Sequence, residues 1–262
     1  MASYPSSMTD SEWVILEALL PTKPDNLRGR PQAHSRRSII DGILYIIRTG
    51  GAWRMMPNDL PDWKTCYHYF RLWAKLGHWE RIHSTLRDMA RLASGKKAPT
   101  AAIIDSQSVR TASQPGVRGY DAGKKITGKK RHLLVHTQGN ILALKVTTAD
   151  VQDRDGAQLL LSVLAVAYGW LKLIWADGGY AGKLVGHVAE IARHSKVKLE
   201  IVKRSDDIKG FKVLPKRWIV ERTFGWLIQS RRLVRDYEVK TEHSEAMIYL
   251  SMSKRMLSRV AS

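Results

Sequence analysis

Two aspartates in this chain follow short apolar runs and could act together on metal ions. The run Ala101-Ala102-Ile103-Ile104 leads directly into Asp105, and Leu173-Ile174-Trp175-Ala176 leads into Asp177. A short apolar run of this kind predicts a buried strand, so each carboxylate is expected at a strand end where ligands can reach it. A third acid, Glu221, lies in a basic segment with helical apolar spacing. Carboxylates brought together in this way repel one another unless cations lie between them.

These three carboxylates predict a site for two Mg²⁺ ions, for which Mn²⁺ could substitute. Magnesium prefers oxygen ligands and keeps several waters, so three carboxylates suffice. Two such ions, roughly 3.5–4 Å apart, promote in-line displacement at phosphorus by acting on the attacking and the leaving oxygen. A lone Asp after an apolar run is more often a turn residue or a cap, so the hypothesis depends on all three acids. Asp150, Asp153 and Asp155 form a competing cluster that is more typical of a helix cap and first turn.

The composition points to a polyanionic partner. The 262 residues include 43 Lys and Arg against 24 Asp and Glu, which gives a formal net charge of +19. A charge of this size favours double-stranded DNA as the partner, and a merely solvated basic surface is the alternative. The single cysteine, Cys66, excludes an internal disulfide and a Cys-rich zinc site. Without a signal pattern or an apolar run of membrane-spanning length, we expect a cytoplasmic protein with no membrane partner.

The chain divides into a predicted helical domain over residues 1–93, a polar linker at 94–100 and an α/β domain over 101–262. In the first domain, Thr9 and Glu12 have the spacing of a capping box, and apolar periodicity predicts four helices. Their predicted bounds are 10–20, 36–49, 64–76 and 78–92. Two interpretations stay open: a helix-turn-helix whose Tyr67–Lys75 helix enters a DNA groove, or a plain bundle with its tryptophans in the core.

In the second domain, the pattern predicts a mixed five-stranded sheet with helices on both faces, preceded by the small all-helical domain. The strands are expected at 101–108, 130–137, 141–148, 171–176 and 197–203, and Gln138-Gly139-Asn140 is a hairpin turn signal. The helices are expected at 153–168, 182–195, 215–237 and 242–259. Asp105 and Asp177 then follow two strands of one sheet, and Glu221 lies on the third of these helices.

Basic residues flank the acids along the chain. The glycine-rich segment Gly119–His132 lets backbone approach DNA closely, and its lysines can neutralise phosphates; a flexible solvated hairpin loop is the alternative. Arg217 lies one helical turn before Glu221, where it either faces a phosphate or forms a surface salt bridge. The predicted DNA-binding residues are Lys124, Lys125, Lys129, Lys130, Arg131, Arg217, Arg222, Arg231 and Arg232.

A set of motifs resembles a known family over nearly the whole chain. The motifs are Asp105-Ser106-Gln107-Ser108, Gly119–Lys125, Lys130–Val135, Ala149–Gly156, Ala176–Tyr180 and Arg217–Arg222, together with the Trp13 region and Gly50–Arg54. They are similar to bacterial insertion-sequence transposases of the IS5 family, within the wider IS4-like DDE group. The resemblance implies an RNase H-like catalytic fold in which Asp105, Asp177 and Glu221 form the DDE triad and bind the metal ions.

The chain departs from the family pattern at three positions. The signature Tyr-x2-Arg-x3-Glu-x6-Lys is matched by Arg217 and Glu221, but Leu214 holds the tyrosine position and Ile228 the lysine position. Arg231 and Arg232 are the candidates to replace that lysine. His136 stands where relatives often carry an acid.

The resemblance implies a Mg²⁺-dependent transposase of the bacterial cytoplasm, associated with the nucleoid. Such an enzyme binds the terminal inverted repeats of its element, cleaves the phosphodiester at the element ends and joins the 3′-OH to target DNA. A synaptic complex holds two DNA ends, so a homodimer on DNA is expected. One alternative is a catalytically silent DNA-binding repressor of the element, and another is a different RNase H-like nuclease such as a junction resolvase.

Overall fold

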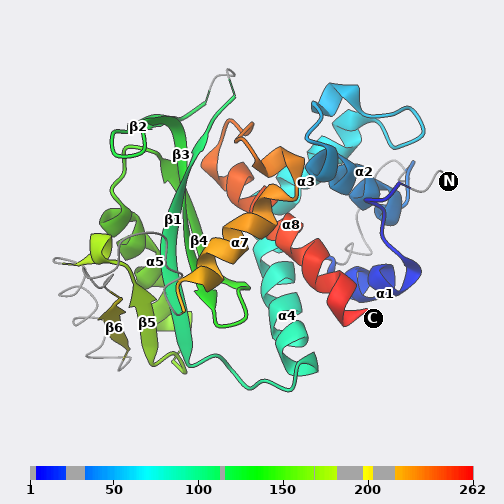
Figure 1. Cartoon of the computed structure of the whole chain (residues 1–262). Coiled ribbons are helices and arrows are strands. Elements are labelled where there is room, and N and C mark those ends of the chain that lie inside the picture. Colours follow the sequence, from blue (N-terminus) through cyan, green and yellow to red (C-terminus); the bar gives the residue numbers. More distant parts are fainter. Residues whose placement is uncertain are drawn as a thin grey trace. The chain divides into compact units, whose positions relative to one another are not determined.

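The computed structural model of the chain describes residues 4–21, 33–112, 116–167, 169–181, 197–202 and 216–261, with backbone alone for 162–167. Contacts divide the chain into two compact units (Figure 1). The first comprises Met1–Ser94, Ile228–Val234 and Ala246–Ser262, and the second comprises Gly95–Leu227 and Arg235–Glu245. The division after Ser94 falls in the predicted linker, whereas the C-terminal segments of the predicted 101–262 domain belong to the first unit. None of the described helices combines the length and the apolar character needed to cross a membrane.

The first unit contains the four predicted helices, each with both bounds within one residue of the prediction. They are α1 (Asp10–Leu19), α2 (Arg36–Thr49), α3 (Trp63–Lys75) and α4 (His78–Ala93), with the 3-10 turns η1 (Trp53–Met55) and η3 (Arg231–Leu233). The predicted capping box is present, because the Thr9 hydroxyl accepts from the Glu12 N–H at 3.2 Å and the Glu12 carboxylate accepts from the Thr9 N–H at 3.0 Å. Local sequence therefore fixes where α1 begins.

The core of the first unit contains the apolar face of α2 and three tryptophans. Trp53, Trp73 and Trp79 are buried, and the Trp79 indole donates to the Phe70 carbonyl at 3.0 Å. This matches the bundle interpretation. The connection from α2 to α3 spans residues 50–62, much longer than the three- or four-residue turn of a helix-turn-helix. The structure therefore gives no helix-turn-helix in which Tyr67–Lys75 is the second helix.

The C-terminal part of α8 (Thr241–Val260) belongs to the first unit because it satisfies a buried acid. The Glu12 carboxylate is almost fully buried and accepts from the Ser258 hydroxyl at 2.6 Å and from the Lys254 ammonium. An unpaired carboxylate at such a site would be strongly destabilising, so these partners hold α8 against α1. Sequence adjacency had assigned residues 246–262 to the α/β domain, and this pairing explains why they pack elsewhere.

The second unit is built on a mixed six-stranded sheet. The strands are β1 (Ala101–Arg110), β2 (Gly119–Asp121), β3 (Ile126–His136), β4 (Ile141–Thr148), β5 (Leu173–Ala176) and β6 (Lys198–Ile201). β3 pairs antiparallel with β1 on one side and with β2 and β4 on the other, and β1, β5 and β6 run parallel. The predicted mixed sheet is confirmed with one strand more than expected. β2 was missed because three residues are too few to show a strand period.

Helices lie on both faces of this sheet, as predicted. Figure 1 shows α5 (Asp153–Ala167) and α7 (Trp218–Ile228) on opposite sides of β1 and β3. The apolar core under α5 includes Ile104, Leu134 and Leu160. The predicted helix over 215–237 is shorter in the structure, because α7 ends at Ile228 and η3 follows it. The predicted helix at 182–195 lies outside the described residues.

Two glycines allow the close packing that shapes the sheet. A Cβ on Gly128 of β3 would lie 2.0 Å from the backbone oxygen of Val109 in β1, and a Cβ on Gly156 of α5 would lie 2.0 Å from the ring of His132. Distances this short cannot be accommodated without moving the backbone or the ring. Glycine at these two positions therefore brings β3 against β1, and α5 against β3.

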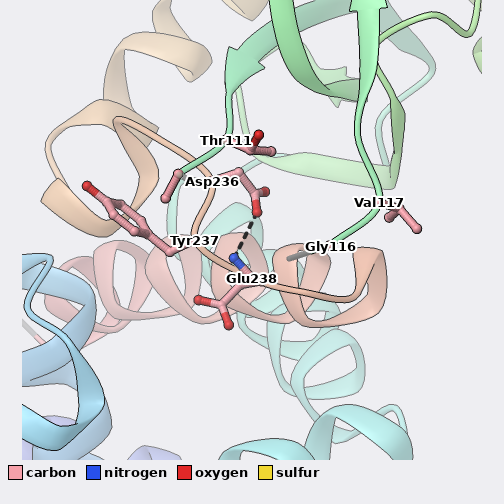
Figure 2. Close-up of a pocket in the computed structure, with 7 residues that line it drawn as sticks. Thr111, Gly116, Val117, Asp236, Tyr237 and Glu238 are labelled. Atoms are coloured by element: carbon pink, nitrogen blue, oxygen red, sulfur yellow. Dashed lines mark hydrogen bonds between the residues drawn. The ribbon is translucent and has the colours of Figure 1, made fainter. Parts of the chain in front are cut away.

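A second contact extends β1 beyond its last strand residue. Thr111 pairs in parallel with Asp236, the Asp236 N–H donates to the Arg110 carbonyl at 2.9 Å, and the Ala112 N–H donates to the Asp236 carbonyl at 2.9 Å. A small pocket lies beside this bridge, where the Asp236 carboxylate accepts from the Glu238 N–H at 3.0 Å (Figure 2). The same carboxylate pairs with the buried Lys129 of β3 at 2.9 Å, so we assign this pocket a structural role.

Candidate active site

The first two candidate acids come from neighbouring parallel strands. Asp177 directly follows β5, and Asp105 lies within β1, two residues beyond the Ile103–Trp175 register pair. Because β1 and β5 run in the same direction, positions that follow this pair reach the same edge of the sheet. β1 continues to Arg110, so Asp105 is a mid-strand residue beside the end of β5. The expected strand end is therefore found at Asp177, and β1 is longer than predicted.

One guanidinium group gathers the three predicted acids. Nη2 of Arg217 lies 3.4 Å from Oδ2 of Asp177, 3.7 Å from Oδ2 of Asp105 and 4.0 Å from Oε1 of Glu221. Glu221 is in the first turn of α7, and Arg217 precedes that helix by one residue. The structure therefore brings together carboxylates from β1, from the end of β5 and from α7. We call Asp105, Asp177 and Glu221 the carboxylate cluster.

The members of the carboxylate cluster differ in their exposure to water. Burial raises the pKa of Asp105 to about 6, against the opposing effects of the Ser106 N–H, which donates to Oδ1 at 2.7 Å, and of Arg217. The charge of Asp177 raises this pKa further. Oδ1 of Asp177 accepts from the Gly179 N–H at 2.9 Å, while the side chain of Glu221 is 53% exposed. Asp105 is thus a poorly hydrated carboxylate whose charged form depends on nearby cations.

The chemistry of the carboxylate cluster fits divalent metal ions with hard oxygen ligands. In the described ranges, no group of three or more His, Cys, Asp or Glu side chains is arranged to hold a metal ion. Magnesium does not require such a group, because it keeps several waters and uses one or two carboxylates together with substrate phosphates. The guanidinium of Arg217 already occupies a point where positive charge is stabilised by three carboxylates. The carboxylate oxygens of Asp105, Asp177 and Glu221 are the type of ligand that Mg²⁺ and Mn²⁺ prefer.

Comparison with known families accounts for both parts of the chain. Residues 8–83 match the family described as "Putative transposase of IS4/5 family", and residues 96–254 match the family described as "Transposase DDE domain". The chain belongs to the DDE transposases. Proteins of this family generally use divalent metal ions and act on DNA, so the observed carboxylate cluster and the basic composition are both in keeping with the transposase family.

Two curated proteins are similar to parts of this chain. The transposase is 32% identical over 106 residues to the insertion element IS402 uncharacterized 16.2 kDa protein of Burkholderia cepacia, a match that covers 38% of the chain and 71% of the relative. It is 26% identical over 85 residues to the uncharacterized protein y4sN of Sinorhizobium fredii (strain NBRC 101917 / NGR234), covering 32% of the chain and 66% of the relative. The first of these links the transposase to an insertion element.

Two lysines predicted to bind DNA are structural in this transposase. The side chain of Lys129 is fully buried, and its ammonium donates to Asp236 Oδ1 at 2.9 Å, to the Ser244 hydroxyl at 3.0 Å and to the Glu238 carbonyl at 2.5 Å. Lys130 is also buried, and its ammonium donates to the Val151 carbonyl at 2.8 Å. β3 begins at Ile126, four residues before the predicted start of the strand at 130, so both lysines lie in a central strand. Both ammonium groups are therefore held inside the fold rather than exposed to solvent.

Three of the predicted arginines are likewise engaged by the fold. Arg131 is fully buried, and its Nη1 donates to Oε1 of Gln107 at 3.3 Å. Arg222 lies against the rings of Trp218 and Trp226, 4.3 and 4.7 Å from their centroids, and donates to a backbone carbonyl at 3.0 Å. In the first unit, Arg232 is buried and donates to a backbone carbonyl at 2.9 Å. Lys124, Lys125 and Arg231 are the predicted DNA-binding residues that remain exposed.

The positions that depart from the family signature are partly explained. Ile228 ends α7 with 51% of its side chain exposed, and Leu214 lies outside the described residues. Nδ1 of the buried His136 accepts from the Gln138 N–H at 3.0 Å. This bond closes the hairpin turn between β3 and β4, where Gly139 has a φ of 90°. His136 therefore has a structural role that the sequence did not reveal.

Proposed function

We propose that this transposase binds the terminal inverted repeats of its insertion sequence, cleaves the phosphodiester at the element ends and joins the resulting 3′-OH to target DNA. The observation that carries the proposal is the carboxylate cluster, in which acids from β1, β5 and α7 surround a single cationic group. Acids so far apart in the chain have no local structural reason to meet. Their convergence is what two-metal phosphoryl chemistry requires.

Each residue of the cluster has a distinct proposed role. Asp105 and Asp177 hold the Mg²⁺ or Mn²⁺ ions, and Glu221 completes their ligand set. When bound, two such ions activate an attacking oxygen and stabilise a leaving oxygen. Arg217 balances the carboxylate charge in the geometry described above, and we propose that it faces a phosphate in the DNA complex. The partial burial of Asp105 keeps water away from the charge and strengthens its interaction with cations.

The DNA partner and the assembly follow from the family and the charge. A formal net charge of +19 over 262 residues supplies the electrostatic attraction that positions a duplex of any sequence. We propose that the helical domain at 1–93 binds the element ends and that residues 101–262 carry out catalysis. Because transposition joins two ends of one element, we propose a homodimer in the synaptic complex, acting in the bacterial cytoplasm at the nucleoid.

The substitution Asp105→Asn tests this function. We expect cleavage of a duplex carrying an element end, assayed with Mg²⁺, to fall by about a hundredfold or more, because a metal ion contributes several kcal/mol to such a transition state. Asp155→Asn is the matched control, since Asp155 is an exposed acid in the first turn of α5 and outside the cluster. Full cleavage by Asp105→Asn would refute the assignment. Binding of element ends without cleavage by the unmodified chain would instead favour the catalytically silent repressor.

A further inference from the structure

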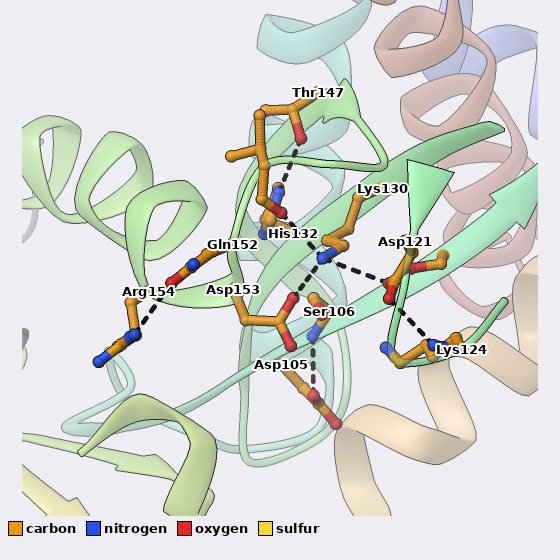
Figure 3. A network of polar contacts seen from close by, with 12 residues as sticks. Asp105, Ser106, Asp121, Lys124, Lys130, His132, Thr147, Gln152, Asp153 and Arg154 are labelled. Carbon is orange, nitrogen blue, oxygen red and sulfur yellow. Dashed lines mark hydrogen bonds and ion pairs between the residues drawn. The ribbon is translucent and has the colours of Figure 1, made fainter. Parts of the chain in front are cut away.

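The turn between β2 and β3 is anchored by a single carboxylate. Oδ1 of Asp121 accepts from the Lys124 N–H at 3.0 Å, and Oδ2 accepts from the Ser108 hydroxyl at 2.5 Å. The ammonium of Lys130 lies 3.3 Å from the same Oδ2 (Figure 3). An Asp that bonds the N–H three residues ahead stabilises a tight turn in the backbone. Asp121 therefore ties the turn at Lys124 to β1 and to β3.

This anchor stays ionised over the whole physiological pH range. Burial alone would raise the pKa of Asp121, but the hydrogen bonds from Ser108 and from the Lys124 N–H, together with Lys130, lower it to about 2. Lys130 is itself fixed by the Val151 carbonyl and by Asp153, whose Oδ1 lies 3.0 Å from its ammonium. Figure 3 shows this network joining the β2–β3 turn to the start of α5. The turn is thus held to three elements of the second unit.

The backbone of the turn is constrained as well. Lys125 has a φ of 52°, in the left-handed region that non-glycine residues seldom occupy. Such a conformation persists where surrounding contacts require it, and it is enriched at sites with a functional role. The turn therefore presents Lys124 in one defined backbone position, and a lysine held in this way loses less conformational entropy on binding a ligand.

The side chain of Lys124 is exposed, and its charge acts on the candidate active site. Its ammonium lowers the pKa of Asp105, of Asp153 and of His132, so it lies within electrostatic reach of β1, α5 and β3 together. In the part of the chain that the structure describes, Lys124 forms no ion pair within 4.0 Å. An exposed basic side chain whose charge reaches Asp105, and that has no carboxylate partner among the described residues, is suited to an anionic ligand.

We propose that Lys124 binds a backbone phosphate of the DNA strand that lies at the carboxylate cluster, and that the Asp121 turn positions it there. The inference rests on the proposed function, because it requires DNA at this edge of the sheet. The proposal gives different roles to Lys124 and Lys130, two lysines of the basic segment Gly119–His132. Lys124 contacts the ligand, whereas Lys130, which resembles it in sequence, fixes the turn from inside the fold.

The test measures binding of a short fluorescein-labelled duplex of arbitrary sequence, by fluorescence anisotropy over a series of salt concentrations in metal-free buffer. An arbitrary sequence suffices because phosphate contacts carry no sequence information. Loss of one phosphate contact flattens the slope of log affinity against log salt by about 0.9. We expect this change for Lys124→Gln, and the unmodified slope for Lys124→Arg and for the control Lys172→Gln, an exposed lysine just before β5 and so at the opposite end of that strand from Asp177.

A second variant tests whether the position of Lys124, and not only its charge, matters for binding. Asp121→Asn keeps both lysines but removes the ionic anchor, so we expect the same flattened slope as for Lys124→Gln. If thermal melting shows that this variant does not fold, Ser108→Ala removes one hydrogen bond to Asp121 and serves in its place. An unchanged slope for Lys124→Gln, or equal changes for Lys124→Gln and Lys172→Gln, would overturn the proposal. Binding without metal does not depend on cleavage, so failure of the Asp105→Asn test would be recognised separately.

Discussion

Replacing Lys129 by Met would reveal whether this residue serves the fold or the DNA. Its side chain is fully buried, and the side chain of its partner Asp236 is only 3% exposed. Without the ammonium, the Asp236 carboxylate keeps a hydrogen bond from the Glu238 N–H at 3.0 Å but loses its buried ion pair. The Ser244 hydroxyl and the Glu238 carbonyl also lose their donor. Breaking a buried ion pair by removing one partner is strongly unfavourable, so the free energy of unfolding should fall.

The expected magnitude follows from the burial of both partners. Removing one partner of a buried ion pair costs about 3–5 kcal/mol. For a chain of this size, each 1 kcal/mol shifts the midpoint of thermal unfolding by roughly 2–4 °C, so we expect a decrease of about 10 °C. Urea unfolding followed by circular dichroism would give the free energy, and a thermal scan would give the midpoint.

Two further variants make the result decisive. Lys125→Met removes an exposed lysine from the same segment and should change stability by no more than about 0.5 kcal/mol. The double variant Lys129→Met with Asp236→Leu removes both charges and should recover part of the loss, because a buried pair can be replaced by apolar groups at little cost. The reasoning would be refuted if Lys129→Met unfolded like the unmodified chain while binding DNA more weakly.

Two other predictions concern the sheet. Burial lowers the pKa of His132 in the folded protein to about 4, whereas the pKa of an unfolded histidine is about 6.5. As the pH falls, the unfolded chain is therefore protonated at His132 before the folded protein is. About 3 kcal/mol of stability is lost between about pH 6.5 and pH 4. Urea unfolding at several pH values should show this loss, and His132→Asn should abolish it; parallel curves for both proteins would contradict the assignment. Gly128→Ala should destabilise by about 1–3 kcal/mol, because its Cβ would lie 2.0 Å from the Val109 oxygen. Thermal melting would measure this effect, and Gly169→Ala, with open space at its Cβ, should melt like the unmodified chain.

Local sequence determined most of the secondary structure. The apolar period of α2 gives its bounds, Arg36–Thr49, and the Thr9 capping box marks the residue before α1. Such signals are local, because a helix repeats every 3.6 residues and its ends need capping groups close by. The two apolar runs that precede Asp105 and Asp177 also predicted adjacent strands, and hence that their acids could meet. The sequence therefore contained the fold class and the candidate site.

Only the tertiary structure decided which basic residues face solvent. Lys124, Lys129 and Lys130 belong to one basic segment and look equivalent in sequence, yet one is exposed and the other two are buried. The difference comes from ion pairs: Lys129 pairs with Asp236, 107 residues later, and Lys130 pairs with both Asp121 and Asp153. A lysine ammonium is buried only where a carboxylate or other acceptor pairs with it. Local sequence periodicity does not show which residues will form that pair. For the same reason, the sequence paired Arg217 only with Glu221, and its contacts with Asp105 and Asp177 appear only in the tertiary structure.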